Sequence, residues 1–337
     1  MTRRNTALAV ALAAIWGASF MFIKVADRQF APMTLVWLRL LLSAAVLVPL
    51  VFVVVGRRAV AEARAQAVRL TVLGLVNSVA PFGLIAWAET RIESGLAAIL
   101  QAAAPLFSVV IATRAGAGRV TRGSMVGVGA GFVGVALLVD AHVRGGHLAA
   151  LAVILAALFY AAGAFYAGRE LRATEPLVVA AGSLASGAVL TTPIGLAQLP
   201  GSLPGWKEIG SVVVLGVVGT GVAYVLYFAL IRDAGASRSI LVTYLVPPVA
   251  LAYGVLLLGE PFRLVGLLGL ALILGGVALA ARRGETIAPP VTLRGDRNVA
   301  REQRDALEPA ADGRVGREVE ASFAGDVRVR VEGDVGD

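Results

Sequence analysis

The sequence predicts an all-α integral membrane protein in which ten transmembrane helices form two inverted five-helix repeats. Of the 337 residues, 58% are hydrophobic and only 15% are charged, whereas soluble chains carry about 25% charged residues. The apolar residues form runs that approach the roughly 20 residues needed to cross the hydrocarbon core. These runs are continuous and do not alternate with polar residues, which favours helices over a β-barrel. The third observation is an internal repeat.

The apolar runs predict ten spans, at about 6–25, 34–55, 68–88, 94–113, 122–139, 148–168, 176–197, 209–230, 238–258 and 263–281. The first is interpreted as a retained helix and not a signal peptide, because its apolar run is long and lacks a small-residue cleavage site. Most loop arginines lie on the side of the N-terminus, and the opposite side carries only Lys24, Arg28, Arg91, Arg144, Lys207 and Arg263. The positive-inside rule therefore predicts that both termini are cytoplasmic.

The two halves of the chain repeat each other. Residues 73–137 align without a gap onto 215–279, at an offset of 142 (215 − 73 = 142), and this places Pro105 on Pro247. Each half has an odd number of predicted spans, so repeat-related helices enter the membrane from opposite sides, as in secondary transporters. A duplicated scaffold without transport is the alternative. The predicted domains are a first repeat at 1–141, a second at 142–283, and a charged tail at 284–337 that is expected to be disordered.

Several classes of chemistry find no support in the sequence. The chain has no cysteine and two histidines, His142 and His147, so neither a disulfide framework nor a thiolate metal site is expected. HExxH, P-loop and GxSxG motifs are missing from the sequence. The net charge of +8 is explained by membrane orientation without a nucleic-acid partner. We expect no enzyme activity, metal or cofactor.

Ionisable groups in the spans are functional candidates, because charge is costly inside lipid. Lys24, Arg39 and Glu89 lie near outer ends of their helices, and Arg39 is roughly 7–8 Å below the boundary at 1.5 Å per residue. One hypothesis is an outer gate of ion pairs that break and reform, to which Glu260 would belong. The alternative is snorkelling and orientation. No carboxylate lies near the middle of a predicted span, so the sequence offers no clear acid for proton coupling and leaves facilitated exchange open.

Polar and aromatic residues predict a cavity for a small zwitterion or amphipathic metabolite. Pro105 and Pro247 each free the carbonyl four residues back, so Gln101 and Thr243 each combine that carbonyl with a hydrogen-bonding side chain. The predicted lining is Trp16, Phe20, Asn77, Trp87, Gln101, Tyr160, Tyr166, Tyr224, Tyr227, Thr243 and Tyr244. The alternative is that these groups bond between helices or form interfacial belts. Small residues such as Gly127 and Gly131 predict that the fifth and tenth helices are scaffold or a homodimer face.

Several motifs in order resemble the EamA branch of the drug/metabolite transporter superfamily. They are Trp16–Gly17 with Phe20, Pro32 and Arg39; the run 86–100 with Pro105–Leu106–Phe107; and Pro247, Gly259–Glu260–Pro261, Gly266, Gly269 and Gly275–Gly276–Val277. The resemblance covers residues 6–281. It implies ten helices, cytoplasmic termini, and export or exchange of amino acids and related metabolites through a cavity lined by helices one, three, four, six, eight and nine. Gly118 is a departure, because it stands where the second half has Glu260.

The combined hypothesis is a secondary transporter that moves a small metabolite, with efflux as the favoured direction, across a bacterial inner membrane by alternating access. Its expected partners are the solute and the lipid bilayer, with no nucleic acid. The alternatives are a flippase for a lipid-linked sugar and a non-transporting scaffold or receptor. The substrate, coupling ion and oligomeric state are left open by the sequence.

Overall fold

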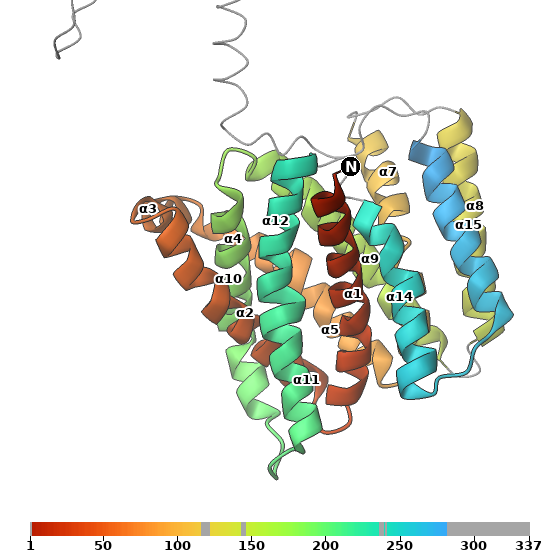
Figure 1. Cartoon of the computed structure of the whole chain (residues 1–337), viewed down its shortest axis with the longest axis horizontal. Coiled ribbons are helices and arrows are strands. Elements are labelled where there is room, and N and C mark those ends of the chain that lie inside the picture. The colour runs from red at the N-terminus through yellow and green to blue at the C-terminus, as the bar shows by residue number, and fades with distance from the viewer. Residues whose placement is uncertain (1, 116–121, 143–145, 236–238, 240, 282–337) are drawn as a thin grey trace, which may run out of the picture. The chain divides into compact units, whose positions relative to one another are not determined.

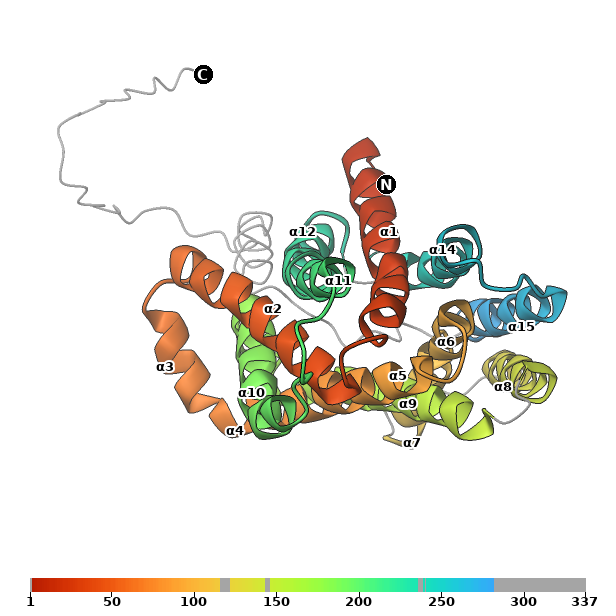
Figure 2. The same cartoon turned by 90° about the horizontal axis from the view of Figure 1, so that it is seen from below.

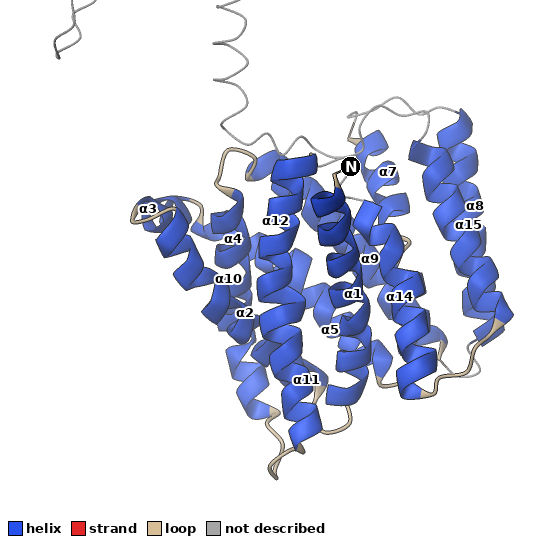
Figure 3. Ribbon diagram, viewed as in Figure 1, coloured by secondary structure: helices blue, strands red, loops and turns tan. Residues whose placement is uncertain are grey.

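The computed structural model describes residues 2–115, 122–142, 146–235, 239 and 241–281. The predicted tail and Gly118 lie outside these ranges. All regular secondary structure within them is helical (Figure 3). Seven of these helical stretches are long and apolar enough to cross a membrane, and three shorter apolar helices accompany them: Met125–Leu138, Val242–Leu258 and Leu264–Leu279. The predicted all-α membrane architecture is confirmed in this form.

The first half of the chain begins with α1 (Arg3–Ala26), whose first turn is capped by the Thr2 hydroxyl accepting from Asn5 N at 3.3 Å. Helix α2 starts at Pro32, where a proline costs no hydrogen bond. The remaining elements of this half are α2 (Pro32–Val54), α3 (Arg58–Ala65), α4 (Ala67–Gly74), η1 (Leu75–Val79), α5 (Ala80–Glu89), α6 (Ser94–Gln101), α7 (Ala104–Arg114) and α8 (Arg122–His142). The short helix α3 was not predicted, because it is too polar to read as a span.

The second half follows the same order. Its elements are α9 (His147–Glu170), α10 (Pro176–Ala197), α11 (Trp206–Gly216), η2 (Val217–Val222), α12 (Ala223–Ala234), α14 (Leu241–Leu258) and α15 (Leu264–Ala281). Helix α10 also starts on a proline, Pro176, which is the repeat mate of Pro32.

Two spans that we predicted as single α-helices contain a π-helical segment. In the first half η1 separates α4 from α5, and in the second half η2 separates α11 from α12. The two segments start at repeat-related residues, since 217 − 75 = 142. A π segment inserts an extra residue per turn and is often found at functional sites. The duplication therefore extends to a local distortion that the apolar pattern does not reveal.

The helices pack around α1. Figure 2 shows α1 between α11–α12 on one side and α14 on the other, with α5 and α9 across from its outer end. Helices α8 and α15 lie side by side at the edge (Figure 1). Their glycines allow this contact: a Cβ on Gly134 would lie 2.8 Å from Leu272 Cβ, and one on Gly276 would lie 2.7 Å from Gly131 N. The small residues predicted to form a scaffold or a dimer face thus pack within one chain.

Candidate functional site

Arg39 is a charged side chain buried inside the helix bundle. It is 8% exposed, its Nε donates to Thr220 Oγ1 at 2.9 Å, and its guanidinium carbon lies 3.7 Å from the Phe82 ring centroid. Thr220 is in η2, halfway along the span 206–234 (220 − 206 = 14 and 234 − 220 = 14). Arg39 therefore reaches a residue in the middle of a neighbouring span, which favours an inward-pointing side chain over snorkelling; its role stays a prediction.

Arg39 has no counter-ion within the part of the chain that the structure describes. Among the described residues, no carboxylate lies within ion-pair distance of its guanidinium; the four ion pairs there are Arg4–Asp233, Arg69–Glu170, Arg169–Glu170 and Arg232–Asp233. Buried charges in proteins are normally paired, because desolvating a lone ion is costly. An unpaired buried cation on a ring face is therefore a candidate site for an anionic group.

Aromatic residues from both repeats surround Arg39. Phe82 stacks on it, Tyr160 and Tyr224 interact with it electrostatically, and the Phe82 and Tyr160 ring centroids are 6.4 Å apart. Phe82 and Tyr224 are repeat mates, since 224 − 82 = 142. Tyr160 is the repeat mate of Trp16 (160 − 16 = 144), whose ring lies 5.3 Å from that of Tyr227. The two halves thus contribute equivalent positions to one aromatic centre.

The other predicted cavity residues are dispersed. Trp87 lies near the C-terminal end of α5 beside Arg91, whose guanidinium carbon is 4.1 Å from the centroid of the Trp87 ring. Tyr166 packs with Leu70, Leu73 and Leu171 in a separate cluster. Asn77, in η1, lies so close to α9 that a Cβ on Gly163 would be 2.6 Å from its Oδ1. Phe20 is buried and Tyr244 is half-buried in the main apolar core.

The two predicted helix breaks differ. The fourth span is interrupted at Ala102 and Ala103, between α6 and α7, directly before Pro105. Helix α14 instead continues through Pro247. Gln101 and Thr243 are both half-buried. The repeat symmetry inferred for these residues from the sequence is therefore not kept by the backbone around them.

A second polar cluster, which we call the outer cluster, lies at the ends of α1, α5 and α14 and consists of Lys24, Asp27, Glu89, Ser94 and Glu260. Lys24 Nζ donates to the carbonyl of Glu89 and, at 2.8 Å, to that of Ile92. Glu260 accepts from Ser94 N at 2.7 Å and Gly95 N at 3.1 Å, at the start of α6. Lys24 and Glu260, two of the four residues predicted to form a gate of ion pairs, are thus held by backbone groups here, and the gating role stays a prediction.

Two carboxylates of the outer cluster are buried without hydrogen-bond donors. Glu89 is 0% exposed, and neither its two oxygens nor those of Asp27 have a hydrogen-bond partner among the described residues. Glu89 interacts electrostatically with Asp27, Lys24, Glu260 and Arg39. Burial raises the pKa of Asp27, which follows α1, to about 8, and the nearby Lys24 opposes that rise.

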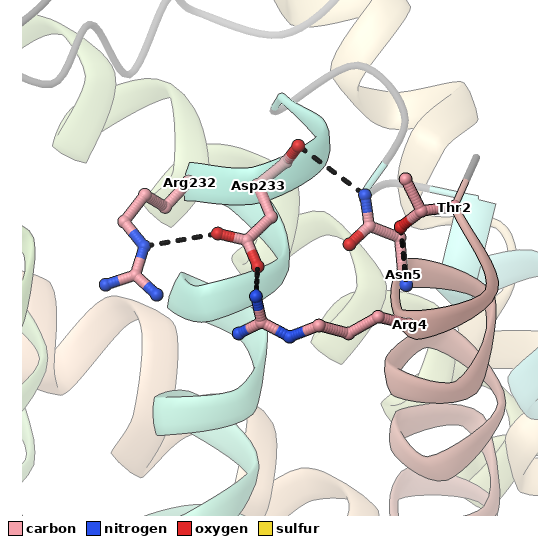
Figure 4. A network of polar contacts seen from close by, with 5 residues as sticks. All are labelled: Thr2, Arg4, Asn5, Arg232 and Asp233. Atoms are coloured by element: carbon pink, nitrogen blue, oxygen red, sulfur yellow. Dashed lines mark hydrogen bonds and ion pairs between the residues drawn. The ribbon is translucent and has the colours of Figure 1, made fainter.

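The opposite end of α1 carries an exposed ionic network, drawn in Figure 4. Arg4 NH1 lies 3.0 Å from Asp233 Oδ2, and Arg232 Nε lies 3.2 Å from Asp233 Oδ1. The amide of Asn5 donates to the carbonyl of Asp233 at 3.5 Å. These contacts tie α1 to the end of α12, as Lys24 ties its other end to the turn between α5 and α6.

A cavity of about 210 Å³ lies between α1, α11, η2 and α14. It is lined by Ala14, Ile15, Ala18, Phe22, Val214, Val218, Gly219 and Tyr253. None of the predicted cavity residues lines it. Its surface suits an apolar group and offers few donors or acceptors for a zwitterion.

Sequence reasoning missed Asp27, Phe82, Ser94 and Thr220. Phe82 could have been found as the repeat mate of Tyr224. Asp27 gave no signal, because it follows a span and looks like an ordinary loop acid. Within the described ranges, no three His, Cys, Asp or Glu residues come together in a way that could hold a metal ion.

The model of the EamA-like transporter family matches this sequence twice, at residues 5–140 and 147–282. The chain belongs to the EamA-like transporter family. The resemblance seen in the motifs is confirmed, and with it a multi-pass membrane transporter of the drug/metabolite type, not an enzyme.

Relatives with transport-related names match much of this chain. A "probable amino-acid metabolite efflux pump" of Salmonella typhimurium is 27% identical over 82% of this chain and 94% of its own length. A "probable terminal-alkyne amino-acid exporter" of Streptantibioticus cattleyicolor is 30% identical over 59% of this chain and 68% of its own. A protein of known crystal structure shares the fold, with a TM-score of 0.60 and 20% identity over 84% of this chain and 98% of its own.

Proposed function

We propose that this EamA protein is a secondary transporter that exports a small metabolite bearing a carboxylate, such as an amino acid, with Arg39 as the anion-binding residue. The observation that carries the proposal is a buried guanidinium that is bonded to Thr220, stacked on Phe82 and without a carboxylate at ion-pair distance among the described residues. A solute carboxylate would supply the missing charge through the bidentate geometry that arginine favours. The names of the Salmonella and Streptantibioticus relatives support an amino-acid-like solute.

The proposed mechanism is alternating access between two oppositely oriented halves. The halves are residues 1–141 and 142–283, each with five spans, and 284–337 form a cytoplasmic tail. Seven long and three shorter apolar helices, paired by the repeat, support ten crossings. The excess of arginine on one side supports cytoplasmic termini in a bacterial inner membrane. A homodimer would use the faces of α8 and α15 that point away from each other, where Met125 and Leu268 are exposed.

The rings around Arg39 support a solute with an apolar body. Tyr160 and Tyr224 add hydroxyl groups beside the cation, while Phe82, Trp16 and Tyr227 offer ring faces. Donors that fix one end and rings that pack the other are typical of sites for small organic ligands. Residues of both repeats meet there, as expected where inverted halves share a midplane site.

The test is counterflow of radiolabelled amino acids in proteoliposomes containing the full chain. Because a hydrogen bond to a charged group contributes about 1.5–3 kcal/mol, we expect Arg39→Gln to reduce uptake by roughly 10- to 100-fold, and Arg39→Lys to retain part of it. Arg91→Gln is the matched control, because Arg91 also stacks on a ring, that of Trp87, but is exposed. Unchanged counterflow by a folded Arg39→Gln protein would overturn the proposal.

A lipid-linked substrate is a second candidate, favoured by the apolar cavity between α1, η2 and α14. An acyl or prenyl chain would enter that cavity, and the polar head would lie near Arg39. Thermal stabilisation by polar lipid extract but not by amino acids would favour this candidate, because a ligand stabilises the state it binds.

A further inference from the structure

The outer cluster joins parts of the chain that are far apart in sequence. Lys24 comes from α1, Asp27 from the connection to α2, Glu89 from the end of α5, and Glu260 from the residues after α14. Lys24 and Asp27 act on each other electrostatically, and both act on Glu89. A change of charge in this cluster would therefore change the electrostatic interactions of helices from both repeats.

The charges of this cluster are held in different ways. Glu260 accepts from two N–H groups of α6, and Lys24 donates to two carbonyls; Arg39, which lies outside the cluster, donates to Thr220. The carboxylates of Asp27 and Glu89 have no comparable hydrogen bonds: none of their four oxygens has a donor among the described residues. The hydroxyl of Ser94, 0% exposed and beside Glu260, is also without a partner. These unpartnered polar atoms form a polar site buried from solvent.

We propose that Asp27 and Glu89 together form the proton-binding site that couples transport, with Lys24 as the group that moves when the proton leaves. The inference rests on the proposed transport function and adds the coupling ion to it. With the proton bound, Lys24 holds α1 to the carbonyls of Glu89 and Ile92. When the proton leaves to solvent, the second negative charge draws the Lys24 ammonium onto the carboxylates, and α1 is released from the turn between α5 and α6.

A proton fits this site better than a metal ion. Two buried carboxylates that lack donors and repel each other lose much of that repulsion and of their desolvation cost when one of them takes up a proton. Metal cations such as Ca²⁺ need six or more oxygen ligands, and among the described residues no three His, Cys, Asp or Glu side chains are placed so that they could hold a metal ion. The ammonium of Lys24 beside both acids also repels a metal cation.

The pKa of Asp27, raised by burial to about 8, gives the direction of the pH dependence. Between its ordinary value of 3.8 and about 8, the buried Asp27 binds more proton than an Asp27 exposed to water. The conformation in which α1 is closed on the α5–α6 turn is therefore favoured at low pH and weakens as pH rises through this window. Above about pH 8 no further loss is expected from Asp27.

The test uses a single introduced cysteine. Because the wild-type chain has no cysteine, all specific labelling reports on the introduced residue. Ile92 is 6% exposed and lies at the turn held by Lys24, so Ile92→Cys reports whether that turn opens. In purified full chain without substrate, we expect the rate of thiol labelling, corrected for thiolate fraction, to rise about tenfold from low to high pH. Asp27→Asn and Glu89→Gln should each make the corrected rate independent of pH. Glu93→Gln, a nearby carboxylate outside the cluster, is the matched control.

Infrared difference spectra of the same samples provide the direct proton readout. We expect a carboxylic-acid C=O band that disappears as pH rises toward about 8 and is absent from that pH window in both Glu89→Gln and Asp27→Asn. Asp27 lies outside the spans, so this variant tests the idea even if Glu89→Gln fails to fold. A missing band, a band unaffected by both variants, or labelling that follows sodium and not pH would overturn the inference. Neither readout needs a substrate, so a failed counterflow assay does not decide the result.

Discussion

Arg39 and Glu89 show how a residue's environment, and not its position in a span, determines its role. Both lie near the outer ends of their helices, yet Arg39 is 8% exposed and Glu89 is 0% exposed. The Arg39 guanidinium contacts a hydroxyl group and an aromatic ring, whereas the carboxylate oxygens of Glu89 have no hydrogen-bond donor among the described residues. Unpaired ionisable groups in a membrane protein are costly and are therefore strong functional candidates. Glu260 contrasts with both, because its charge is satisfied at the start of α6.

Removing the Glu260 carboxylate should weaken the start of α6. The side chain accepts from Ser94 N and Gly95 N, so Glu260→Ala leaves two N–H groups without an acceptor. Loss of such a cap costs about 1 kcal/mol. Thermal unfolding in detergent should show a lower Tm than the wild type, whereas Arg263→Ala, an exposed residue of the same connection, should not. Equal Tm values for the two variants would show that this contact contributes nothing.

At the scale of elements, the apolar pattern located the spans but not their internal breaks. The π segments η1 and η2 occupy equivalent positions in the third and eighth predicted spans, although their residues differ: Asn77 and Ser78 in η1 correspond to Gly219 and Thr220 in η2. Their backbones depart from the α-helix because packing against neighbouring helices outweighs local preference. The fourth span is interrupted just before Pro105, whereas α14 continues through Pro247. We attribute this difference as well to packing against neighbouring helices.

Adjacent glycines in α15 provide a matched test of helix packing. A Cβ on Gly276 would meet backbone atoms of Gly127 and Gly131 in α8, whereas a Cβ on Gly275 would meet nothing within 4 Å. Backbone atoms cannot move aside, so Gly276→Ala should lower the free energy of unfolding by about 1–3 kcal/mol. Gly275→Ala should leave it unchanged or raise it slightly. Similar stabilities by thermal or denaturant unfolding would show that α8 and α15 do not pack in this way.

At the scale of the whole molecule, the two family matches and the repeated π segments describe a duplicated transporter. The helix α1 is tied at one end to α12 through Arg4 and Asp233, and at the other end to the α5–α6 turn through Lys24. An alternating-access cycle requires the contacts at one end to open while those at the other stay closed. The ionic network of Arg4 and the outer cluster are therefore the contacts whose exchange the mechanism predicts.

The inverted topology can be tested at one repeat-related pair of residues. Thr90 and Arg232 are repeat mates, since 232 − 90 = 142, and both are exposed. In intact cells, a membrane-impermeant maleimide should label Thr90→Cys but should reach Arg232→Cys only after permeabilisation. The cysteine-free parent is the control for background labelling. Labelling of both cysteines from the same side would rule out two oppositely oriented halves.

The sequence by itself determined the class of protein, the order of the spans, the repeat and the family, because hydrophobic run length and residue identity along the chain carry that information. It named Arg39, Tyr160 and Tyr224 without showing that they meet. The tertiary structure alone decided that Arg39 turns inward to Thr220 and Phe82, that Lys24 bonds to carbonyls and not to Glu89's carboxylate, and that Asp27 belongs with Glu89. Burial and pairing depend on which helix faces which, and a single chain does not encode helix rotation in its apolar pattern.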